Sequence, residues 1–281
     1  METRIQLRTP HDDVEAPVIV NDFTWRRGGN FRMEAGPSRH VPGNMDEFLV
    51  TTNRGESSAP GVYKPFEEPD LMLDFAKLKT ASDVLQFANK FGELGFDNET
   101  WRLQYRHLYG PESVMEWLSE AAGVRHVLSI WELIEGNDTA ALRRIFQWDG
   151  DAVLANLGHG HRVLVANWHH NTEWLPRMKK GDVLTPAKLY LAFQINYRLK
   201  GAADVGIRLD SVRKFRPISR PVNLLRGIWI MVSETATGIR KVRPCEKCRE
   251  LMDVTTHRSH KQMHSRCSLR ERMRKYRGKQ K

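Results

Sequence analysis

The amino-acid sequence predicts a mainly α-helical fold, with minor β structure in the N-terminal segment and a small C-terminal lobe. Three observations lead to this prediction. Residues 1–70 are rich in glycine and proline, residues 71–239 carry apolar side chains at helical spacing, and residues 240–281 contain all three cysteines of the 281-residue chain. We therefore expect loops and short strands first, then a helical domain, and then a compact lobe that contains the cysteines.

Composition indicates a folded and soluble protein. Hydrophobic residues make up 40% of the chain, and eight of them are tryptophan, which is enough apolar surface to build a core. The N-terminal sequence METRIQLRTPHDD lacks the apolar stretch of a signal peptide, and the run GIWIMV at 227–232 is far too short to span a bilayer. We expect a cytoplasmic protein without membrane contact, and the odd number of cysteines favours free thiols over a disulfide framework.

Capping and stop signals place the helices along the chain. Thr80-Ala-Ser-Asp83 resembles a capping box, with Asp in place of the usual Glu, and predicts a helix over 81–91. A longer buried helix is expected from Pro111 to Gly136, because apolar residues recur at helical spacing between them. The apolar run at 161–168 fits either a strand or a helix. Further helices are predicted from Asp138 to Phe146, from Thr185 to about Gly201 and from Pro221 to Gly238.

Positive charge is concentrated at the C-terminal end of the chain. Residues 240–281 contain 15 Lys and Arg but only 4 Asp and Glu, a balance of +11, whereas the whole chain carries +10. Residues 1–239 therefore carry about −1. A cationic field that is confined to one short segment is typical of a surface that binds a polyanion such as nucleic acid, because each Lys or Arg placed on a phosphate releases counterions.

The cysteines have the spacing of a metal site. Cys245 and Cys248 form a C-x2-C pair, and His264 and Cys267 form a second pair at the same spacing, which gives C-x2-C-x15-H-x2-C overall. Two thiolates of a knuckle and one more pair can occupy the four corners of a tetrahedron around Zn²⁺. The sequence therefore predicts a structural zinc site with these four residues as ligands.

Two other histidines compete with His264 as the fourth ligand. His257 and His260 lie in the same basic loop, and His260 would leave six residues before Cys267. His264 is preferred because the short spacing places it and Cys267 together at the start of the following helix. There the free backbone N–H groups and the positive end of the helix dipole favour thiolates.

The predicted C-terminal helix, residues 266–278, carries two stripes. Leu269, Met273 and Tyr276 recur at helical spacing and are expected to pack on the zinc lobe, because so small a lobe needs apolar cover. Arginines recur beside them in a row whose mutual repulsion an anion would relieve. The candidate nucleic-acid-binding residues are Arg258, Lys261, Arg266, Arg270, Arg272, Arg274, Lys275 and Arg277.

The C-terminal region resembles bacterial zinc-finger proteins of the CGNR type and related treble-clef-like fingers. The resemblance rests on the knuckle, the basic loop, the second ligand pair and the Arg-rich helix, with Ser265 or Ser268, Arg270, Arg272, Arg274 and Tyr276-Arg277 matching the pattern of those proteins. In the body, YKPFEEPDLMLDFAKL and DVLQFANKFGELG are similar to the opening of helical bacterial proteins that carry such a finger. The resemblance implies nucleic-acid binding, to DNA more than to RNA, and transcription regulation. It also implies a helical domain that senses an effector or binds a protein partner.

A second group of histidines suggests an alternative function. His159, His161, His169 and His170 fall within twelve residues, with Asp149, Asp151 and Glu173 close to them in sequence. Imidazoles with carboxylates can hold a catalytic metal, so this group would suit a metal-dependent nuclease that the finger directs to its target. No HExxH or comparable spacing accompanies them, and loop histidines are more often ordinary surface or core residues.

The main functional expectation is a zinc-finger nucleic-acid-binding protein without catalysis of its own. The sequence contains no GxGxxG, GxxxxGK[ST] or GxSxG motif, so dinucleotide, P-loop and hydrolase functions lack their usual sequence anchor. The alternatives are the nuclease that uses the histidine group and a protein–protein adaptor in which the finger docks an acidic partner. Divalent-metal-dependent cleavage of nucleic acid would favour the nuclease. Tight binding of an acidic protein without nucleic-acid affinity would favour the adaptor.

Overall fold

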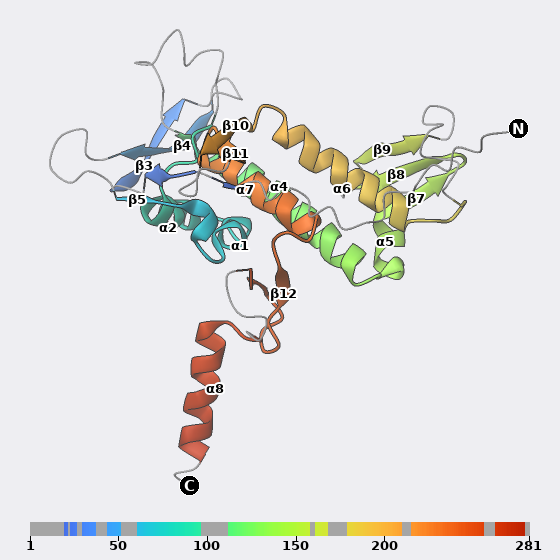
Figure 1. The fold of residues 1–281 in the computed structure, drawn as a ribbon. Coiled ribbons are helices and arrows are strands. Elements are labelled where there is room, and N and C mark those ends of the chain that lie inside the picture. Colours follow the sequence, from blue (N-terminus) through green and yellow to red (C-terminus); the bar gives the residue numbers. More distant parts are fainter. Residues whose placement is uncertain are drawn as a thin grey trace, which may run out of the picture.

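The computed structural model shows a mixed α/β protein rather than a mainly α-helical one. It describes residues 20–21, 23–26, 30–37, 44–51, 61–96, 112–157, 161–167, 179–209, 215–255 and 262–278. The helices of this part are η1 (Pro65–Glu67), α1 (Leu71–Ala76), α2 (Ala81–Phe91), α4 (Val114–Glu135), α5 (Thr139–Ile145), α6 (Leu184–Leu199), α7 (Leu224–Ala236) and α8 (Ser265–Gly278). They form the centre of the molecule, apart from α8, which extends from it (Figure 1).

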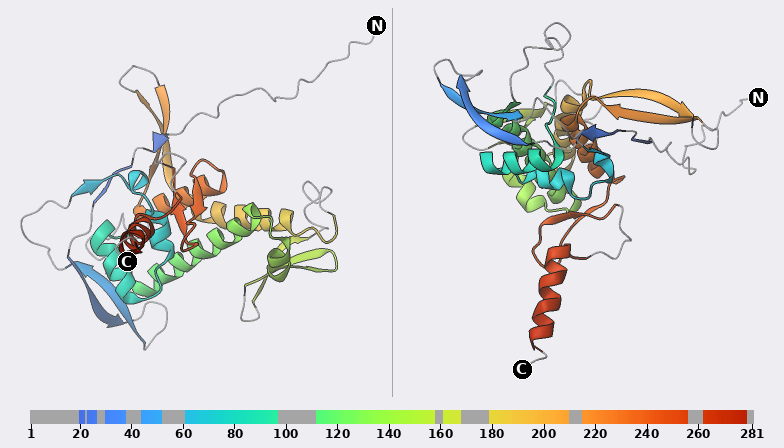
Figure 2. Two further views of the ribbon diagram at one scale, coloured as in Figure 1. Left: turned by 90° about the horizontal axis from the view of Figure 1, so that it is seen from below. Right: turned by 90° about the vertical axis from the view of Figure 1, so that its left-hand side faces the viewer.

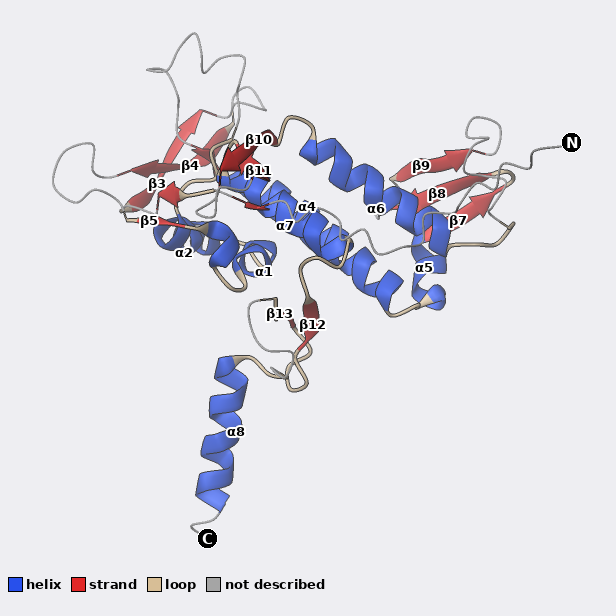
Figure 3. Ribbon diagram, in the orientation of Figure 1, coloured by secondary structure: helices blue, strands red, loops and turns tan. Residues whose placement is uncertain are grey.

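Small sheets surround the helices, as Figure 3 shows. Two of the three-stranded sheets have the orders β3-β4-β6 and β7-β8-β9, the third has β1-β11-β10, and β2-β5 and β12-β13 form two-stranded sheets. Among the described strands, all pairings are antiparallel except that of β1 with β11. The strands are β1 (Val20–Asn21), β2 (Trp25–Arg26), β3 (Phe31–Pro37), β4 (Met45–Thr51), β5 (Val62–Tyr63), β6 (Glu112–Ser113), β7 (Phe146–Asp149), β8 (Ala152–Asn156), β9 (Arg162–Asn167), β10 (Ala203–Leu209), β11 (Phe215–Pro221), β12 (Val242–Pro244) and β13 (Leu251–Asp253).

The expectation of a mainly helical domain over 71–239 therefore holds only in part. Strands β6 to β11 lie inside this range, and the ambiguous run at 161–168 forms the edge strand β9. Short apolar runs such as Ala152–Asn156 pair through their backbones with the strands next to them in the sequence, and a run this short cannot be told from a helix segment by its periodicity. The short strands expected within residues 1–70 are present as β1 to β5.

Side-chain caps explain where three helices begin. The Thr80 hydroxyl accepts from the Asp83 backbone N–H at 3.2 Å, and the Asp83 carboxylate accepts from the Thr80 N–H at 2.9 Å, which confirms the predicted capping box of α2. Asp138 caps α5 by accepting from the Ala141 N–H at 2.9 Å. The helix predicted to start at Pro221 instead begins at Leu224, where Asn223 caps α7, and Pro221 ends strand β11.

The long helix α4 organises the core. It packs against α1, α2, α6 and α7, and its Trp117 is fully buried against Phe75 and Phe87. The helix begins after Ser113 rather than at the predicted Pro111, which lies outside the described residues. Both faces of α4 are therefore covered by other helices, which explains the continuous apolar stripe in its sequence. In the described part of the chain no helix is both long and apolar enough to cross a membrane.

A buried carboxylate lies next to α4. Glu112 accepts hydrogen bonds from the backbone N–H groups of Leu94, Gly95 and Phe96 at 3.1, 2.6 and 3.1 Å, and from the indole N–H of Trp117 at 2.8 Å. Burial raises the pKa of Glu112 to about 7, and the nearby Glu93 carboxylate adds to this rise although the backbone donors oppose it. Glu112 thus joins the loop after α2 to the start of α4.

Candidate metal centre and basic helix

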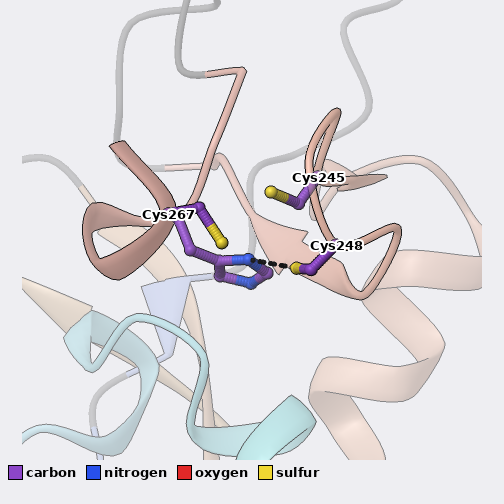
Figure 4. A group of neighbouring side chains, drawn as sticks. Cys245, Cys248 and Cys267 are labelled. Carbon is purple, nitrogen blue, oxygen red and sulfur yellow. Dashed lines mark hydrogen bonds between the residues drawn. The ribbon is translucent and has the colours of Figure 1, made fainter. Parts of the chain in front are cut away.

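Three cysteines and one histidine meet at the C-terminal end of the fold. Cys245 and Cys248 lie in the turn between β12 and β13, His264 directly precedes α8, and Cys267 lies in the first turn of α8. Their four candidate ligand atoms all lie within 4.8 Å of one another (Figure 4). The structure therefore brings the four predicted residues together into a cluster that can hold a metal ion such as zinc.

The knuckle takes its shape from backbone hydrogen bonds. The Cys245 N–H donates to the Glu250 carbonyl at 2.8 Å, and the Arg249 N–H donates to the Cys245 carbonyl at 2.9 Å. Arg249 adopts a left-handed conformation, with φ of 62°, which lets the chain reverse tightly after Cys248. The turn therefore presents both thiols to the same side, toward the start of α8 (Figure 4).

The histidine is held with one particular nitrogen toward the thiols. Its Nδ1 lies 3.3 Å from the Cys248 Sγ, close to the roughly 3.5 Å that a thiolate and an imidazole nitrogen keep across a tetrahedral zinc ion. Its Nε2 lies 3.2 Å from the Leu251 carbonyl oxygen. Because a carbonyl only accepts, Nε2 carries the proton and Nδ1 keeps its lone pair for a metal. The competing His257 and His260 lie outside the described residues.

The surroundings of the thiols suit a metal that prefers thiolates. Burial would raise the pKa of Cys245, but backbone hydrogen bonds from Cys248, His264 and Lys247 lower it to about 6. Burial raises the pKa of the Cys267 thiol, as does its hydrogen bonding with Cys248 and Cys245. A cluster in which one cysteine is readily ionised and an imidazole offers a free lone pair fits zinc better than a hard cation.

The apolar cover of the lobe differs from the prediction. Met252 and Val254 of the hairpin are buried with Cys245 and Cys267, and Met263 packs against them. Leu269, Met273 and Tyr276 are instead 54%, 51% and 67% exposed, so the expectation that they pack on the lobe is wrong. The lobe is only a short hairpin, and α8 runs on past it, as the right view of Figure 2 shows.

The predicted basic residues fall into three groups. Arg266 forms an ion pair with Glu250, and Arg274 forms one with Glu271 at 2.7 Å. Arg270 and Arg272 are exposed and form no ion pair with another described residue. Arg258 and Lys261 lie outside the described residues, as do the side chains of Lys275 and Arg277, whose backbones belong to α8.

The lobe is attached to the body by a buried ion-pair network that sequence reasoning missed. Arg240 follows α7 and pairs with Asp253 of β13 and with Glu234 of α7, the latter at 3.2 Å. The side chains of Arg240 and Asp253 are each only 6% exposed. Asp70 accepts from the Asp253 backbone N–H at 2.8 Å, and Arg240 donates to the Phe66 carbonyl at 3.3 Å. No local spacing pattern marks these residues, because they come from three separate segments of the chain, 66–70, 234–240 and the strand β13.

A second contact between lobe and body runs through Glu250. Its carboxylate lies 3.5 Å from Lys77 Nζ, at the end of α1, and also pairs with Arg266 at the start of α8. Burial would raise the pKa of Glu250, but Lys77 and Arg266 lower it below its ordinary value. One acidic residue thus links the body, the hairpin and the basic helix.

The histidine group falls mostly outside the described residues. His159, His169, His170 and Glu173 lie there, while His161 is exposed at the start of β9. Within the part of the chain that is described, the Cys245, Cys248, His264 and Cys267 cluster is the candidate metal site that forms.

Comparisons of the chain with protein-family models, with curated proteins and with solved structures found no match.

Proposed function

We propose that the C-terminal lobe is a structural zinc finger and that its helix α8 binds nucleic acid, with DNA as the preferred form. The observation that carries this proposal is the exposed position of arginines on a helix that starts at the metal cluster and extends from the body (Figure 1). Zinc would be held by Cys245, Cys248, Cys267 and His264 Nδ1, and would fix the start of α8 to the hairpin. Regulation of transcription is the role that the resemblance of the finger implies, and we propose it here for a cytoplasmic protein.

The existing ion pairs of α8 do not prevent its arginines from binding phosphate. Arg266 and Glu250 have side chains that are about half exposed, and the Arg274 side chain is more exposed still. Exposed ion pairs of this kind contribute only about 0–1 kcal/mol, so a phosphate can replace the carboxylate. Arg270 and Arg272 are already available in the described structure.

Two alternative functions, an enzyme and a protein–protein adaptor, differ in class from the nucleic-acid binder. A nuclease would use His159, His161, His169 and His170, and a protein–protein adaptor would use the lobe to bind an acidic partner. A protein partner or effector at the helical domain is compatible with either function. We favour the nucleic-acid binder because the charge of the chain is concentrated where the structure also exposes arginines on α8.

The test is the salt dependence of binding to a duplex DNA by the full-length protein. If about four to six cations contact phosphates, log K should fall with log[salt] at a slope of about −4 to −5, from about −0.9 per contact. Replacing Arg270 and Arg272 together by Ala should reduce the steepness of the slope by about two. At 0.1 M salt the double variant should bind about 60-fold more weakly than the parent, because each lost contact lowers log K by about 0.9 for each tenfold drop of salt below 1 M.

A matched variant removes the same charge elsewhere. Arg143 and Arg144 lie exposed on α5, in the body, so their replacement by Ala should leave the salt slope unchanged. If both double variants reduce the slope equally, α8 is not the nucleic-acid surface. If the parent protein shows no salt-dependent binding to duplex DNA, the proposed function is wrong.

A further inference from the structure

The apolar stripe of α8 has no partner in the described part of the molecule. Leu269, Met273 and Tyr276 are more than half exposed, although they lie in a row on a single helix. Figure 1 and the right view of Figure 2 show α8 extending away from the rest of the described structure. Three large apolar side chains in one exposed row indicate a surface that another molecule covers.

The stripe has arginines on both of its sides. At 3.6 residues per turn, Leu269, Met273 and Tyr276 fall within about 60° of one another around the helix axis. Arg266 and Arg270 follow within about 20–60° beyond one edge of the stripe, on the same count. Arg272 lies about 40° beyond the other edge. The helix therefore presents a narrow apolar strip with cations on either side.

We propose that α8 lies in the major groove of duplex DNA with this strip facing the base edges, and that it favours sites rich in 5-methyl groups. The inference rests on the proposed function and adds the orientation of the helix and the feature of the bases that it recognises. The major groove of B-DNA is about 12 Å wide and accepts an α-helix, with a phosphate strand on each side. Cations on both sides of α8 match these two strands, and the strip between them meets the thymine methyl groups that line the groove floor.

Other occupants fit the strip less well. Two copies of α8 packed face to face would bring Arg266, Arg270 and Arg272 of each helix close to those of the other, which like charges oppose. A membrane surface favours a broad apolar face of about 100° or more, whereas this strip covers about 60°. The major groove of an A-form RNA helix is deep and too narrow for side chains to read. Charge complementarity on both sides therefore favours duplex DNA.

The test compares duplexes that differ only in methyl groups. The full-length protein is titrated with an alternating dA–dT duplex and with the same duplex in which uracil replaces thymine, so that the phosphates and base pairs are unchanged. Each methyl contacted should contribute about fourfold in affinity, from the transfer free energy of one buried methylene-sized group. We expect tighter binding to the thymine duplex, and the same direction for 5-methylcytosine against cytosine in a dG–dC duplex, with equal salt slopes throughout.

Variants connect the methyl preference to the strip. Replacing Leu269 and Met273 together by Ala should abolish the difference between the thymine and uracil duplexes while preserving the salt slope. Both side chains are exposed, so the fold and the zinc content should stay unchanged. Met115, an equally exposed methionine of α4, is the matched control, and Met115→Ala should keep the full methyl preference.

Three results would overturn the inference. Equal affinity for the thymine and uracil duplexes, with a normal salt slope, would mean that α8 binds DNA but does not face its bases. A methyl preference that survives the Leu269 and Met273 replacements would assign the recognition to another element. Binding to vesicles of anionic lipid that the same variant loses, without any methyl preference, would make the strip a membrane contact. A parent protein without salt-dependent DNA binding would instead remove the proposed function itself.

Discussion

Replacing Arg240 by Met should disconnect the lobe from the body and destabilise the whole protein. Arg240 is the cation of a buried network, and the variant would leave the Asp253 carboxylate almost fully buried without its partner. Met retains most of the apolar length of Arg, so the change isolates the loss of the charge and its hydrogen bonds. Removing one partner of a buried ion pair costs about 3–5 kcal/mol, because the remaining charge is no longer compensated.

The magnitude is large compared with ordinary stability. Folded proteins are stable by about 5–15 kcal/mol, so a loss of about 3–5 kcal/mol would remove roughly a fifth or more of the free energy of unfolding. With a urea m value of about 3 kcal/mol/M, the unfolding midpoint should fall by about 1 M. Circular dichroism in urea, on the zinc-loaded full-length protein, measures this shift.

Two further variants separate the network from a general effect of losing an arginine. Arg32 and Glu34 form an exposed ion pair on β3, so Arg32→Met should change stability by less than about 1 kcal/mol. The double variant Arg240→Met with Asp253→Asn should lose less free energy of unfolding than the two single variants lose in sum. Each single variant already loses the Arg240–Asp253 interaction, so the sum includes it twice. If Arg240→Met is no more harmful than Arg32→Met, the buried network does not hold the lobe to the body.

Three other predictions concern the metal, a buried carboxylate and a helix cap. Cys267→Ser should abolish zinc binding as measured by metal analysis of the purified protein, and retention of zinc would contradict the assigned ligand set. Glu112 has a pKa of about 7 in the fold, against 4.5 for an ordinary glutamate. Its protonated form therefore contributes to the free energy of unfolding in full below about pH 4.5, and this contribution is lost as the pH rises through 7. Between pH 5 and 8 the parent should therefore lose about 2–3 kcal/mol more stability than Glu112→Gln, and parallel pH profiles would refute the shift. Thr80→Ala should cost about 1 kcal/mol through the lost cap, whereas the neighbouring Ser82→Ala should change little, and equal effects would argue against the capping box.

Local sequence signals predicted which segments are helical better than they predicted the residue at which each helix begins. The Thr80 box and Asp138 predicted α2 and α5 correctly, because a cap and its helix are neighbours in the sequence. The prediction that α7 starts at Pro221 was wrong, because this proline is the last residue of strand β11. The cap of α7 is Asn223. Most strands within 71–239 were missed for a different reason, because their apolar runs are short and periodicity does not distinguish a short strand from a buried helix segment.

The metal cluster was easier to predict than its surroundings. Two ligand pairs at matched spacing were enough to select the Cys3His set, because a tetrahedral site constrains both ligand type and number. The same spacing said nothing about Arg240, whose partners come from separate segments. It also could not show that Leu269, Met273 and Tyr276 extend past the lobe, since periodicity identifies a stripe and not what covers it.

The thiol cluster makes metal retention sensitive to oxidation. All three cysteines of the chain belong to the cluster, so any disulfide within the chain removes two of the four metal donors and leaves one thiol behind. Cys248 is the exposed member and is therefore the thiol that a dissolved oxidant reaches first. Disulfide formation would therefore compete with metal binding at this cluster, and an oxidised chain would have to be reduced before the cluster could hold a metal ion. Counting reactive thiols should distinguish the metal-free reduced chain, which offers all three, from the oxidised chain, which offers a single one.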